Sequence, residues 1–149
     1  MSVKIAIVGA GAAGLLAAVI AARNGASVTL YEKNERVGIK LSITGKGRCN
    51  VTNNSTPSKV IENIPTNPKF MYTALNAFSP PDTMAFFEEL GVPLKTERGD
   101  RVFPVSDKAK DIVNALVNEI NRLGVTVIHR KVSGILIQDG IAYGVYARA

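Results

Sequence analysis

Apolar residues in the first part of the chain change their spacing twice, which predicts a strand, a helix and a second strand in succession. The run Val3–Val8 is short, apolar and rich in β-branched residues, so we expect a buried strand there. Gly9–Gly14 follows it, and an alanine-rich apolar helix then extends to Arg23, before an Asn-Gly pair that ends it. Ser27–Tyr31 predicts the second strand, with Glu32 at its end.

The turn between the first strand and the helix has the glycine spacing of a dinucleotide-binding site. Gly9 permits a tight turn, Gly11 lets a pyrophosphate approach the backbone, and Gly14 lets the helix pack closely against the strand. The start of the helix, with Ala12 and Ala13, offers free N–H groups and a partial positive charge to phosphates. We therefore predict that this turn holds the pyrophosphate of a dinucleotide.

An acidic residue completes the predicted site. Glu32 lies 18 residues beyond Gly14, where its carboxylate can accept hydrogen bonds from a ribose hydroxyl pair. The same negative charge would repel a 2′-phosphate, so NADP is disfavoured as the ligand of this motif. A tight turn that binds no ligand is the alternative, and it leaves Glu32 unexplained.

The middle of the chain predicts short elements separated by turns. Residues 54–68 lack periodicity and predict a surface connector, and residues 69–77 predict a short helix with Phe70, Leu75 and Phe78 facing inward. Ser79 is expected to cap a helix over 82–90 whose core residues are Met84, Phe86 and Phe87. Residues 92–98 and 101–105 alternate around a Gly-Asp pair and predict a hairpin.

The last third of the chain returns to the parallel sheet. Ser106 is expected to cap a helix over 107–123, with Asp107 in its first turn and one apolar face formed by Ile112, Leu116, Ile120 and Leu123. Residues 125–129 predict a third parallel strand that ends at His129, for which we expect a structural or solvent-facing role. Residues 132–137 and 141–146 predict a hairpin around Asp139-Gly140. The fold class is therefore α/β, a Rossmann-like three-layer domain with a parallel sheet, helices and a β-meander.

Length and composition restrict the class of protein. A chain of 149 residues with 46% hydrophobic and 20% charged residues is typical of one globular domain. The sequence contains no apolar run of 18 residues, and the first strand starts too near Met1 to leave room for a signal peptide. Cys49 is the only cysteine, which excludes an internal disulfide and a cysteine-based metal site. We expect a cytoplasmic protein with no membrane partner.

The net charge of +6 is concentrated in one segment. Between Lys33 and Arg48 the chain carries five cationic residues and, as the single acid, Glu35. Such a segment can attract an anionic cofactor or substrate, and a simple solvated face is an equal alternative. Nucleic acid is not an expected partner, because the segment has no aromatic residue on which a base could stack.

The segment Gly38–Asn53 contains three glycines and many polar residues, so we expect an irregular loop that lies close against a ligand. Arg48 brings a planar cation suited to phosphate or carboxylate, and Asn50 can hold a turn or bind the edge of a ring. Cys49 is expected to be a small buried side chain. A redox-active thiol is the alternative, and no second cysteine or adjacent histidine supports it.

Two strings make the chain resemble a known family: Gly38–Asn53, read GIKLSITGKGRCNVTN, and Gly99–Lys108, read GDRVFPVSDK. The sequence resembles the N-terminal part of the BaiN/YhiN-like, or aminoacetone-oxidase-like, family of NAD(P)/FAD-dependent oxidoreductases, over essentially all of its residues. The resemblance implies that the dinucleotide is FAD and that the loop from Gly45 to Asn50 runs near the flavin. It further implies cofactor contacts by Lys33, Lys40, Gly47, Arg48, Cys49 and Asn50, with the Val132 backbone at the adenine edge.

The resemblance implies a flavin-dependent oxidoreductase with NADH or NADPH as the candidate reductant. Relatives of this family are much longer, so we expect the chain to be the N-terminal segment of a larger FAD-binding protein, without its second domain and C-terminal FAD motif. Because the edge of the first strand is unpaired, we expect the chain alone to self-associate or to bind FAD weakly. A non-catalytic nucleotide-binding module and an NAD-binding dehydrogenase domain stay open as alternatives. The sequence identifies no catalytic acid or base and no substrate.

Overall fold

The computed structural model describes residues 2–148, which form two compact units. The first unit comprises the residues up to Leu41 and those from Leu116 onward, and the second comprises Ser42–Ala115. The chain passes from the first unit to the second within α2 (Ile39–Gly47) and returns within α6 (Ala109–Arg122).

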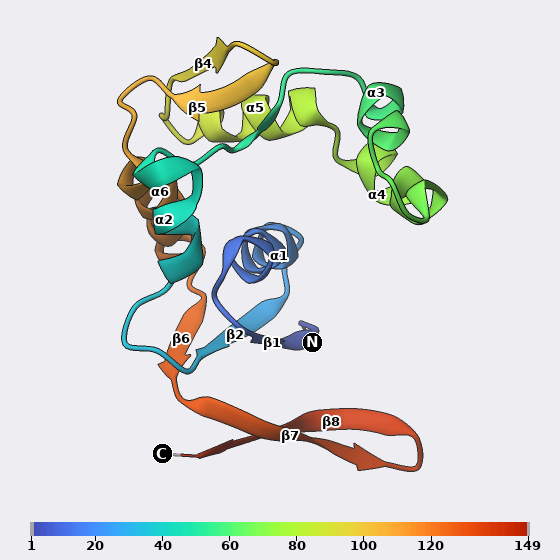
Figure 1. Cartoon of the computed structure of the whole chain (residues 1–149). Helices are drawn as coiled ribbons and strands as arrows, with labels where there is room; N and C mark the ends of the chain where they lie inside the picture. The colour runs from blue at the N-terminus through green and yellow to red at the C-terminus, as the bar shows by residue number, and fades with distance from the viewer. Residues whose placement is uncertain (1, 149) are drawn as a thin grey trace. The chain divides into compact units, whose positions relative to one another are not determined.

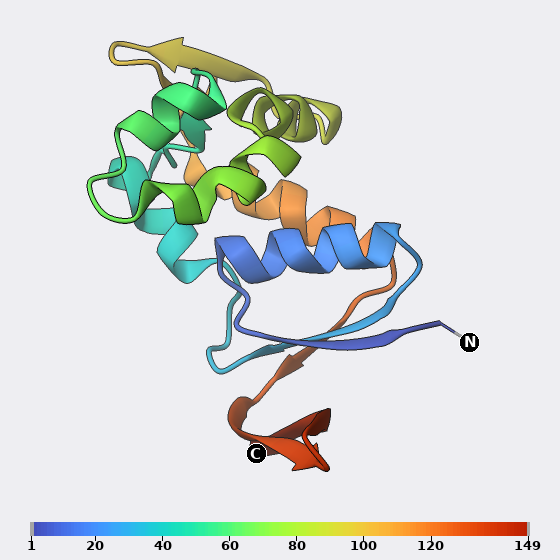
Figure 2. The ribbon, with the colours of Figure 1, turned by 90° about the vertical axis from the view of Figure 1, so that its right-hand side faces the viewer.

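The first unit has three layers, and Figure 1 and Figure 2 show an element on each side of its sheet. All three strands of the sheet are parallel, as the sequence predicts, and their order is β1-β2-β6. One layer is α1 and the opposite layer is the β7–β8 hairpin. The bounds are β1 Lys4–Val8, α1 Ala12–Arg23, β2 Ser27–Glu32, β6 Thr126–His129, β7 Lys131–Gln138 and β8 Ile141–Arg148.

Apolar side chains join α1 to the sheet. Leu15, Ala18 and Val19 of the helix and Leu30 of β2 have no exposed surface, and Val28 is 4% exposed. The alternation along β2 buries every second residue, which is the pattern of a strand with one face packed against a helix. This α/β arrangement is the Rossmann-like fold class that the sequence predicts.

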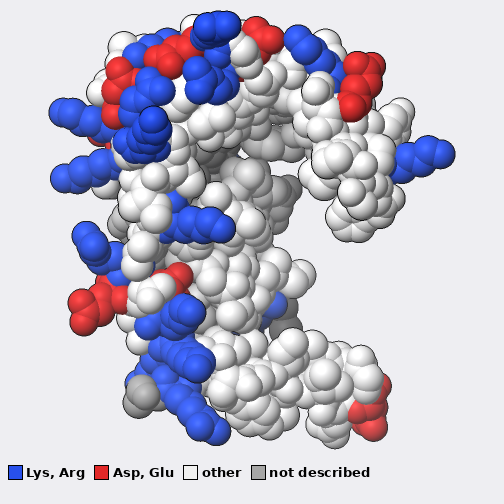
Figure 3. All heavy atoms as spheres, in the orientation of Figure 1, with Lys and Arg blue, Asp and Glu red and all other residues white. Residues whose placement is uncertain are grey.

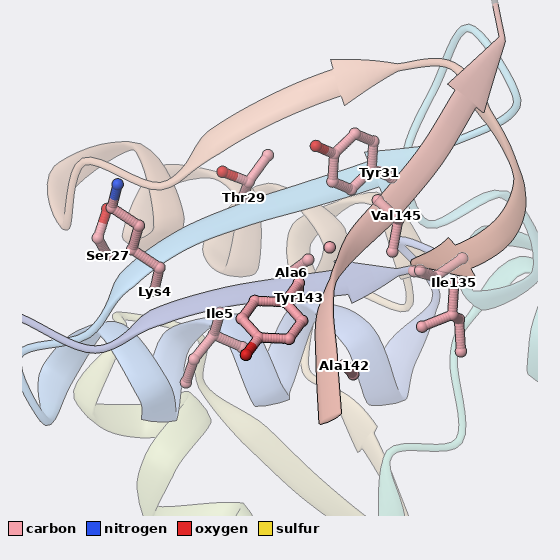
Figure 4. A pocket seen from close by; sticks show the side chains of 12 residues that line it. Lys4, Ile5, Ala6, Ser27, Thr29, Tyr31, Ile135, Ala142, Tyr143 and Val145 are labelled. Atoms are coloured by element: carbon pink, nitrogen blue, oxygen red, sulfur yellow. The ribbon is translucent and has the colours of Figure 1, made fainter. Parts of the chain in front are cut away.

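The β7–β8 hairpin leaves a space against the opposite face of the sheet. Its two strands are antiparallel and turn at Asp139 and Gly140, whose positive φ angles of 50° and 76° are those of the predicted two-residue turn. Figure 4 shows side chains of β1, β2 and the hairpin lining a cavity of about 570 Å³. Apolar residues of the hairpin such as Ile135 and Tyr143 are 59% and 64% exposed.

The second unit is built on an antiparallel sheet in the order β3-β5-β4. Its core contains Phe86, Phe87, Val102 and Phe103, all at most 8% exposed. The predicted hairpin is confirmed, and so is the Ser79 cap, whose hydroxyl and backbone exchange hydrogen bonds with Asp82. The elements are β3 Thr52–Asn53, α3 Pro57–Glu62, the 3₁₀ helix η1 Pro68–Met71, α4 Tyr72–Ala77, α5 Pro80–Glu89, β4 Leu94–Glu97 and β5 Arg101–Pro104.

Two predictions between residues 54 and 77 are wrong. The expected connector contains α3, because Thr56 accepts a hydrogen bond from the Lys59 N–H and Pro57 suits the first helical turn. Phe70, predicted to face inward, is 78% exposed. The helical stretch starts there as a 3₁₀ turn, so spacing counted from an α-helix places Phe70 on the wrong face.

Two further boundaries differ from the sequence prediction. Residues 39–47, expected to be irregular, begin as a helix that breaks at Thr44, Gly45 and Lys46. The long helix of the last third begins at Ala109 and not at Asp107, since Asp107 has a positive φ of 56° and cannot continue a right-handed helix. Among the described residues, no helix combines the length and apolar character needed to cross a membrane.

A buried carboxylate ties α1 to α6 within the first unit. Glu119 is 6% exposed, and its oxygens accept hydrogen bonds of 2.8 to 2.9 Å from the guanidinium groups of Arg122 and Arg23. The hydrogen bonds from Arg122 and then Arg23 outweigh the effect of burial and lower the pKa of Glu119 from 4.5 to about 2.

The shifted pKa of Glu119 predicts a loss of stability in acid. A carboxyl whose pKa is lower in the folded state stabilises the fold fully above pH 4.5, and this contribution declines as the pH falls towards about 2. We expect Glu119→Gln to remove about 1–3 kcal/mol of the pH-dependent free energy of unfolding in this interval. Urea unfolding from pH 6 to pH 2 measures it, and parallel pH profiles of the variant and the wild type would contradict it.

The free edge of β1 is defined by the direction of its backbone groups. The Gly9 N–H donates to the Tyr31 carbonyl at 2.7 Å, and the Val3 carbonyl accepts from the Ser27 N–H at 2.8 Å. Odd-numbered residues of β1 therefore bond to β2, and the N–H and C=O groups of even-numbered residues such as Ala6 point away from it. Within residues 2–148, β2 is the only strand paired with β1.

We expect this edge to pair with β1 of a second copy, which gives a dimer at high protein concentration. Ala6→Pro removes an N–H from the free edge and leaves the ladder to β2 intact, so it should shift the mass towards one protomer. Light scattering during size-exclusion chromatography measures the mass. A wild-type chain that is one protomer at all concentrations, or an Ala6→Pro variant that associates as the wild type does, would contradict this expectation.

Candidate functional site

The glycine turn after β1 is built around the contact between Gly9 and Gly14. Gly9 has a φ of 97°, a conformation that favours glycine. A Cβ placed on Gly14 would lie 1.8 Å from the Gly9 carbonyl oxygen and 3.5 Å from Cγ2 of Ile7. The start of α1 can therefore approach the end of β1 only because residue 14 has no side chain. Both glycines have the structural role that their spacing predicts.

Gly11 has no such structural reason to be glycine. Its φ of −84° is available to any residue, and a Cβ built there would meet no atom within 4 Å. It is the exposed N-cap residue that precedes α1, with Ala12 and Ala13 exposed beside it. The first N–H groups of a helix have no partner within the helix, so this surface presents donors and a partial positive charge to open space. The geometry fits a phosphate that approaches the backbone.

Glu32 lies at the end of β2, and its carboxylate is hydrogen-bonded to the backbone of the glycine turn. Its Oε2 accepts from the Ala10 N–H at 2.9 Å, and its Oε1 accepts from the backbone and side-chain nitrogens of Asn34 at 2.9 and 2.7 Å. Glu32 is 7% exposed, and burial opposes its ionisation. The hydrogen bonds from Asn34 and Ala10 outweigh burial, and the pKa of Glu32 lies below its usual value.

The three hydrogen bonds limit what Glu32 can do for a ligand. A carboxylate has about four acceptor positions, and the Lys33 N–H also lowers the pKa of Glu32, so at most about one position is left for a ribose hydroxyl. The sequence predicts acceptance from a hydroxyl pair, and the structure gives Glu32 a second task, the support of the glycine turn. Lys33 follows Glu32 and is exposed, and Lys40 is exposed on α2. The Gly38 N–H donates to the Ala10 carbonyl at 2.8 Å and links the loop after β2 to the same turn.

Most of the predicted Gly38–Asn53 loop, from Ser42 onward, lies in the second unit, and its backbone is unusual. Gly45, Lys46, Gly47 and Cys49 all have positive φ angles, from 57° to 83°. Two of them are not glycine, and such residues keep this conformation only where neighbours impose it. The Cys49 N–H donates to the Thr44 carbonyl at 3.0 Å and closes the loop.

Arg48 is held by two carboxylates and a ring. Its Nη1 lies 2.9 and 3.1 Å from the two oxygens of Glu97 and 3.3 Å from Oδ1 of Asp107. The guanidinium carbon lies 4.0 Å from the centroid of the Phe103 ring. Lys95 donates to Asp107 at 2.7 Å and lies 3.4 Å from Glu97. Arg48 lowers the pKa of Glu97, and Lys95 does the same for the pKa of Asp107.

The residues after Arg48 are fixed by the β-sheet of the second unit. Cys49 has no exposed surface, and burial raises the pKa of its thiol, so the buried side chain expected from the sequence is confirmed. In its satisfied orientation the Asn50 side-chain nitrogen donates to the carbonyls of Val102 and Thr52 at 3.2 and 3.0 Å. The side chain of Asn50 therefore holds a turn.

The predicted site residues fall into two groups. The first unit brings together the glycine turn and Glu32, and it also carries Lys33, Lys40 and Val132. The second unit carries Gly47, Arg48, Cys49 and Asn50. Val132 is half-buried and lies opposite Ala147 in the hairpin, so a role for its backbone at an adenine edge stays a prediction.

The partners of both groups are not among the residues predicted from the sequence. The Glu32 carboxylate accepts hydrogen bonds from Asn34 as well as from the glycine turn. An asparagine two residues after the acid is a recognisable turn signal. Glu97, Asp107 and Lys95 are distant from Arg48 in the sequence, and no spacing rule connects them. His129 is exposed, and its Nδ1 lies 2.6 Å from the Asn34 carbonyl oxygen, which fits the structural or solvent-facing role expected for it.

Comparison with known proteins identifies relatives over most of the chain. A family model described as the HI0933-like protein Rossmann domain matches residues 3–147. A 3-dehydro-bile acid delta(4,6)-reductase of Clostridium scindens is 36% identical over 126 residues, and a ribosomal RNA dihydrouridine synthase of Haemophilus influenzae is 32% identical over 125. Each match covers 83% of this chain and 30% of the relative, so the matched segment spans less than a third of each relative's length.

Among solved structures, Thermovibrio ammonificans THI4 is similar with a TM-score of 0.65. The match covers 99% of this chain and 48% of that one, at 14% sequence identity. At this level of identity the similarity establishes the fold alone.

The contact between Gly14 and Gly9 predicts a specific sensitivity to substitution. Gly14→Ala places a methyl group against backbone that cannot move away cheaply, so we expect it to lower the free energy of unfolding by about 3 kcal/mol. Gly144→Ala is the matched control, because its Cβ meets no atom within 4 Å. Urea unfolding of both variants measures the difference. Equal stability of the two variants would show that α1 does not approach β1 as described.

Proposed function

The chain belongs to the HI0933-like Rossmann domain family, and from this premise we propose that it binds FAD as part of a flavin-dependent oxidoreductase. The first unit holds the ADP half of the cofactor, with the pyrophosphate at the glycine turn. Gly11 is the observation that carries this proposal, because neither its φ nor its surroundings require glycine until a ligand lies against the backbone. The exposed N–H groups of Ala12 and Ala13 add donors at the same place.

Glu32 supports the proposal from the other side of the turn. Its lowered pKa keeps the carboxylate ionised at neutral pH, and its remaining acceptor position suits a hydroxyl of the adenosine ribose. A negative charge here disfavours a 2′-phosphate. Lys33 is exposed next to the acid and adds a cation near the phosphates.

The second unit contributes the loop from Gly45 to Asn50 at the flavin end, as the family resemblance implies. Lys40 and the backbone of Gly47, Cys49 and Asn50 are the proposed contacts, since the side chains of Cys49 and Asn50 are engaged within the protein. When bound, FAD supplies the hydride chemistry, and NADH or NADPH is the proposed reductant. The protein positions the cofactor and excludes competing reactions.

The names of two relatives suggest the class of reaction. A delta(4,6)-reductase and a dihydrouridine synthase are both named for the addition of hydrogen across carbon–carbon double bonds, in a steroid acid and in a pyrimidine of RNA. We propose the same class here, reduction of a carbon–carbon double bond activated by a carbonyl group. The two substrates, a bile acid and a ribosomal RNA, differ in size and chemical class, so the proposal does not extend to a particular substrate.

Gly11→Ala tests the proposed cofactor site directly. The added methyl group occupies the space through which the pyrophosphate approaches, so we expect FAD affinity to fall by about tenfold or more, equivalent to at least about 1.4 kcal/mol. The free energy of unfolding should stay within about 0.5 kcal/mol of the wild type, because no protein atom meets the new Cβ. Quenching of FAD fluorescence measures the affinity, and urea unfolding measures the stability.

The ligand must also be identified. Mass spectrometry of the nucleotide released by the purified protein should yield FAD, and Gly144→Ala should bind FAD as the wild type does. Release of NAD in place of FAD, or unchanged FAD affinity in Gly11→Ala, would contradict the proposed function.

A further inference from the structure

The Gly45–Cys49 loop has a backbone that its own sequence does not explain. Lys46 and Cys49 have φ angles of 57° and 60°, which residues with a Cβ rarely adopt. The loop is also crowded, because a Cβ on Gly45 would lie 2.9 Å from the Asn50 nitrogen and 3.1 Å from Cε1 of Phe103. Surrounding groups must therefore hold the loop in this conformation.

The side chain of Arg48 connects the loop to two other segments of the second unit. Glu97 lies on β4, Asp107 lies between β5 and α6, and Phe103, under the guanidinium, lies on β5. The hydrogen bonds to Glu97 are 2.9 and 3.1 Å long. A planar guanidinium between carboxylates and a ring face is a geometry that fixes orientation as well as position.

The charges of Arg48 and its ion-pair partners cancel. Two cations, Arg48 and Lys95, face two carboxylates, Glu97 and Asp107, at distances of 2.7 to 3.4 Å. Figure 3 shows the same mixture of acidic and basic side chains over β4 and β5. A neutral group of four has little field beyond its own contacts, so Arg48 is poorly suited to attract an anion or to balance charge on a reduced flavin.

We infer that Arg48 is a positioning residue. Its ion pairs with Glu97 and Asp107 fix the backbone of Gly45–Asn50 in the conformation that contacts the flavin. This inference rests on the proposed function for the identity of the ligand. It assigns the cofactor contacts of this loop to backbone groups and removes the Arg48 guanidinium from among them.

A charge role and a positioning role predict opposite effects for one substitution. Glu97→Gln removes a negative charge next to Arg48 and keeps the shape of the side chain. If Arg48 acted through its charge, the variant would bind anionic FAD more tightly. If Arg48 acts through the loop, the variant loses charge-assisted hydrogen bonds and binds FAD less tightly.

Cys49 offers a direct readout of the loop that needs no cofactor. It is the only cysteine, and it has no exposed surface, so its reaction with the neutral reagent iodoacetamide requires the loop to open. We expect Arg48→Lys, which keeps the charge but loses the planar group, and Glu97→Gln to accelerate this reaction about three- to tenfold. Asp100→Asn is the matched control, since it breaks the exposed Lys59–Asp100 pair of the same unit.

FAD titration of the same four proteins completes the experiment. We expect Arg48→Lys and Glu97→Gln to bind FAD more weakly, by about the same factor by which they accelerate the reaction of Cys49 with iodoacetamide. Asp100→Asn should leave both FAD binding and Cys49 reactivity unchanged. Tighter binding by Glu97→Gln, or unchanged Cys49 reactivity in both variants, would overturn the positioning role. If the wild type binds no FAD while Cys49 reacts faster in both variants, the proposed function is overturned. The same result would still support the role of the Arg48 ion pairs in holding the loop.

Discussion

The approach of α1 to the end of β1 is the constraint on which the first unit depends. Gly14 meets the Gly9 carbonyl where any side chain would collide with it. This contact places the start of the helix above the carboxyl end of the sheet and brings the Ala10 N–H to within 2.9 Å of the Glu32 carboxylate. The turn, the helix start and the acid at the end of β2 thus form one rigid arrangement, and each part limits the freedom of the others.

The Gly45–Cys49 loop of the second unit is stabilised differently, because it has no regular ladder of backbone hydrogen bonds. Ion pairs and a buried thiol hold it instead. Arg48 stacks on Phe103 and pairs with Glu97 and Asp107, and Cys49 fills a fully buried position beside it. The sequence shows a strongly cationic segment between Lys33 and Arg48. In the fold, Glu97 and Asp107, which are distant in the sequence, neutralise the charge of Arg48.

The elements of the first unit could be predicted from the sequence because local signals agree there. A strand over residues 3–8, the glycine turn and Glu32 lie where the sequence predicts them, but β1 is an edge strand with Val3 and Val8 69% and 58% exposed, so the expectation of a buried strand is wrong. Phe70 and Asp107 show where this fails. A 3₁₀ start turned Phe70 outward, and a positive φ at Asp107 moved the start of α6 and freed its carboxylate for Arg48. Phe70 depends on a local 3₁₀ turn that apolar spacing does not reveal, and the carboxylate of Asp107 pairs with residues distant in sequence.

The one-sided pairing of β1 has a consequence for the exchange of its amide protons with solvent. Odd-numbered residues donate their N–H groups to β2, and even-numbered ones such as Lys4 and Ala6 direct theirs to the outside. Protection should consequently alternate residue by residue along a strand that is otherwise regular. Amides of odd-numbered residues in β1 should exchange slowly and those of even-numbered residues quickly. If a further strand pairs with β1, the even-numbered amides become protected and the alternation disappears.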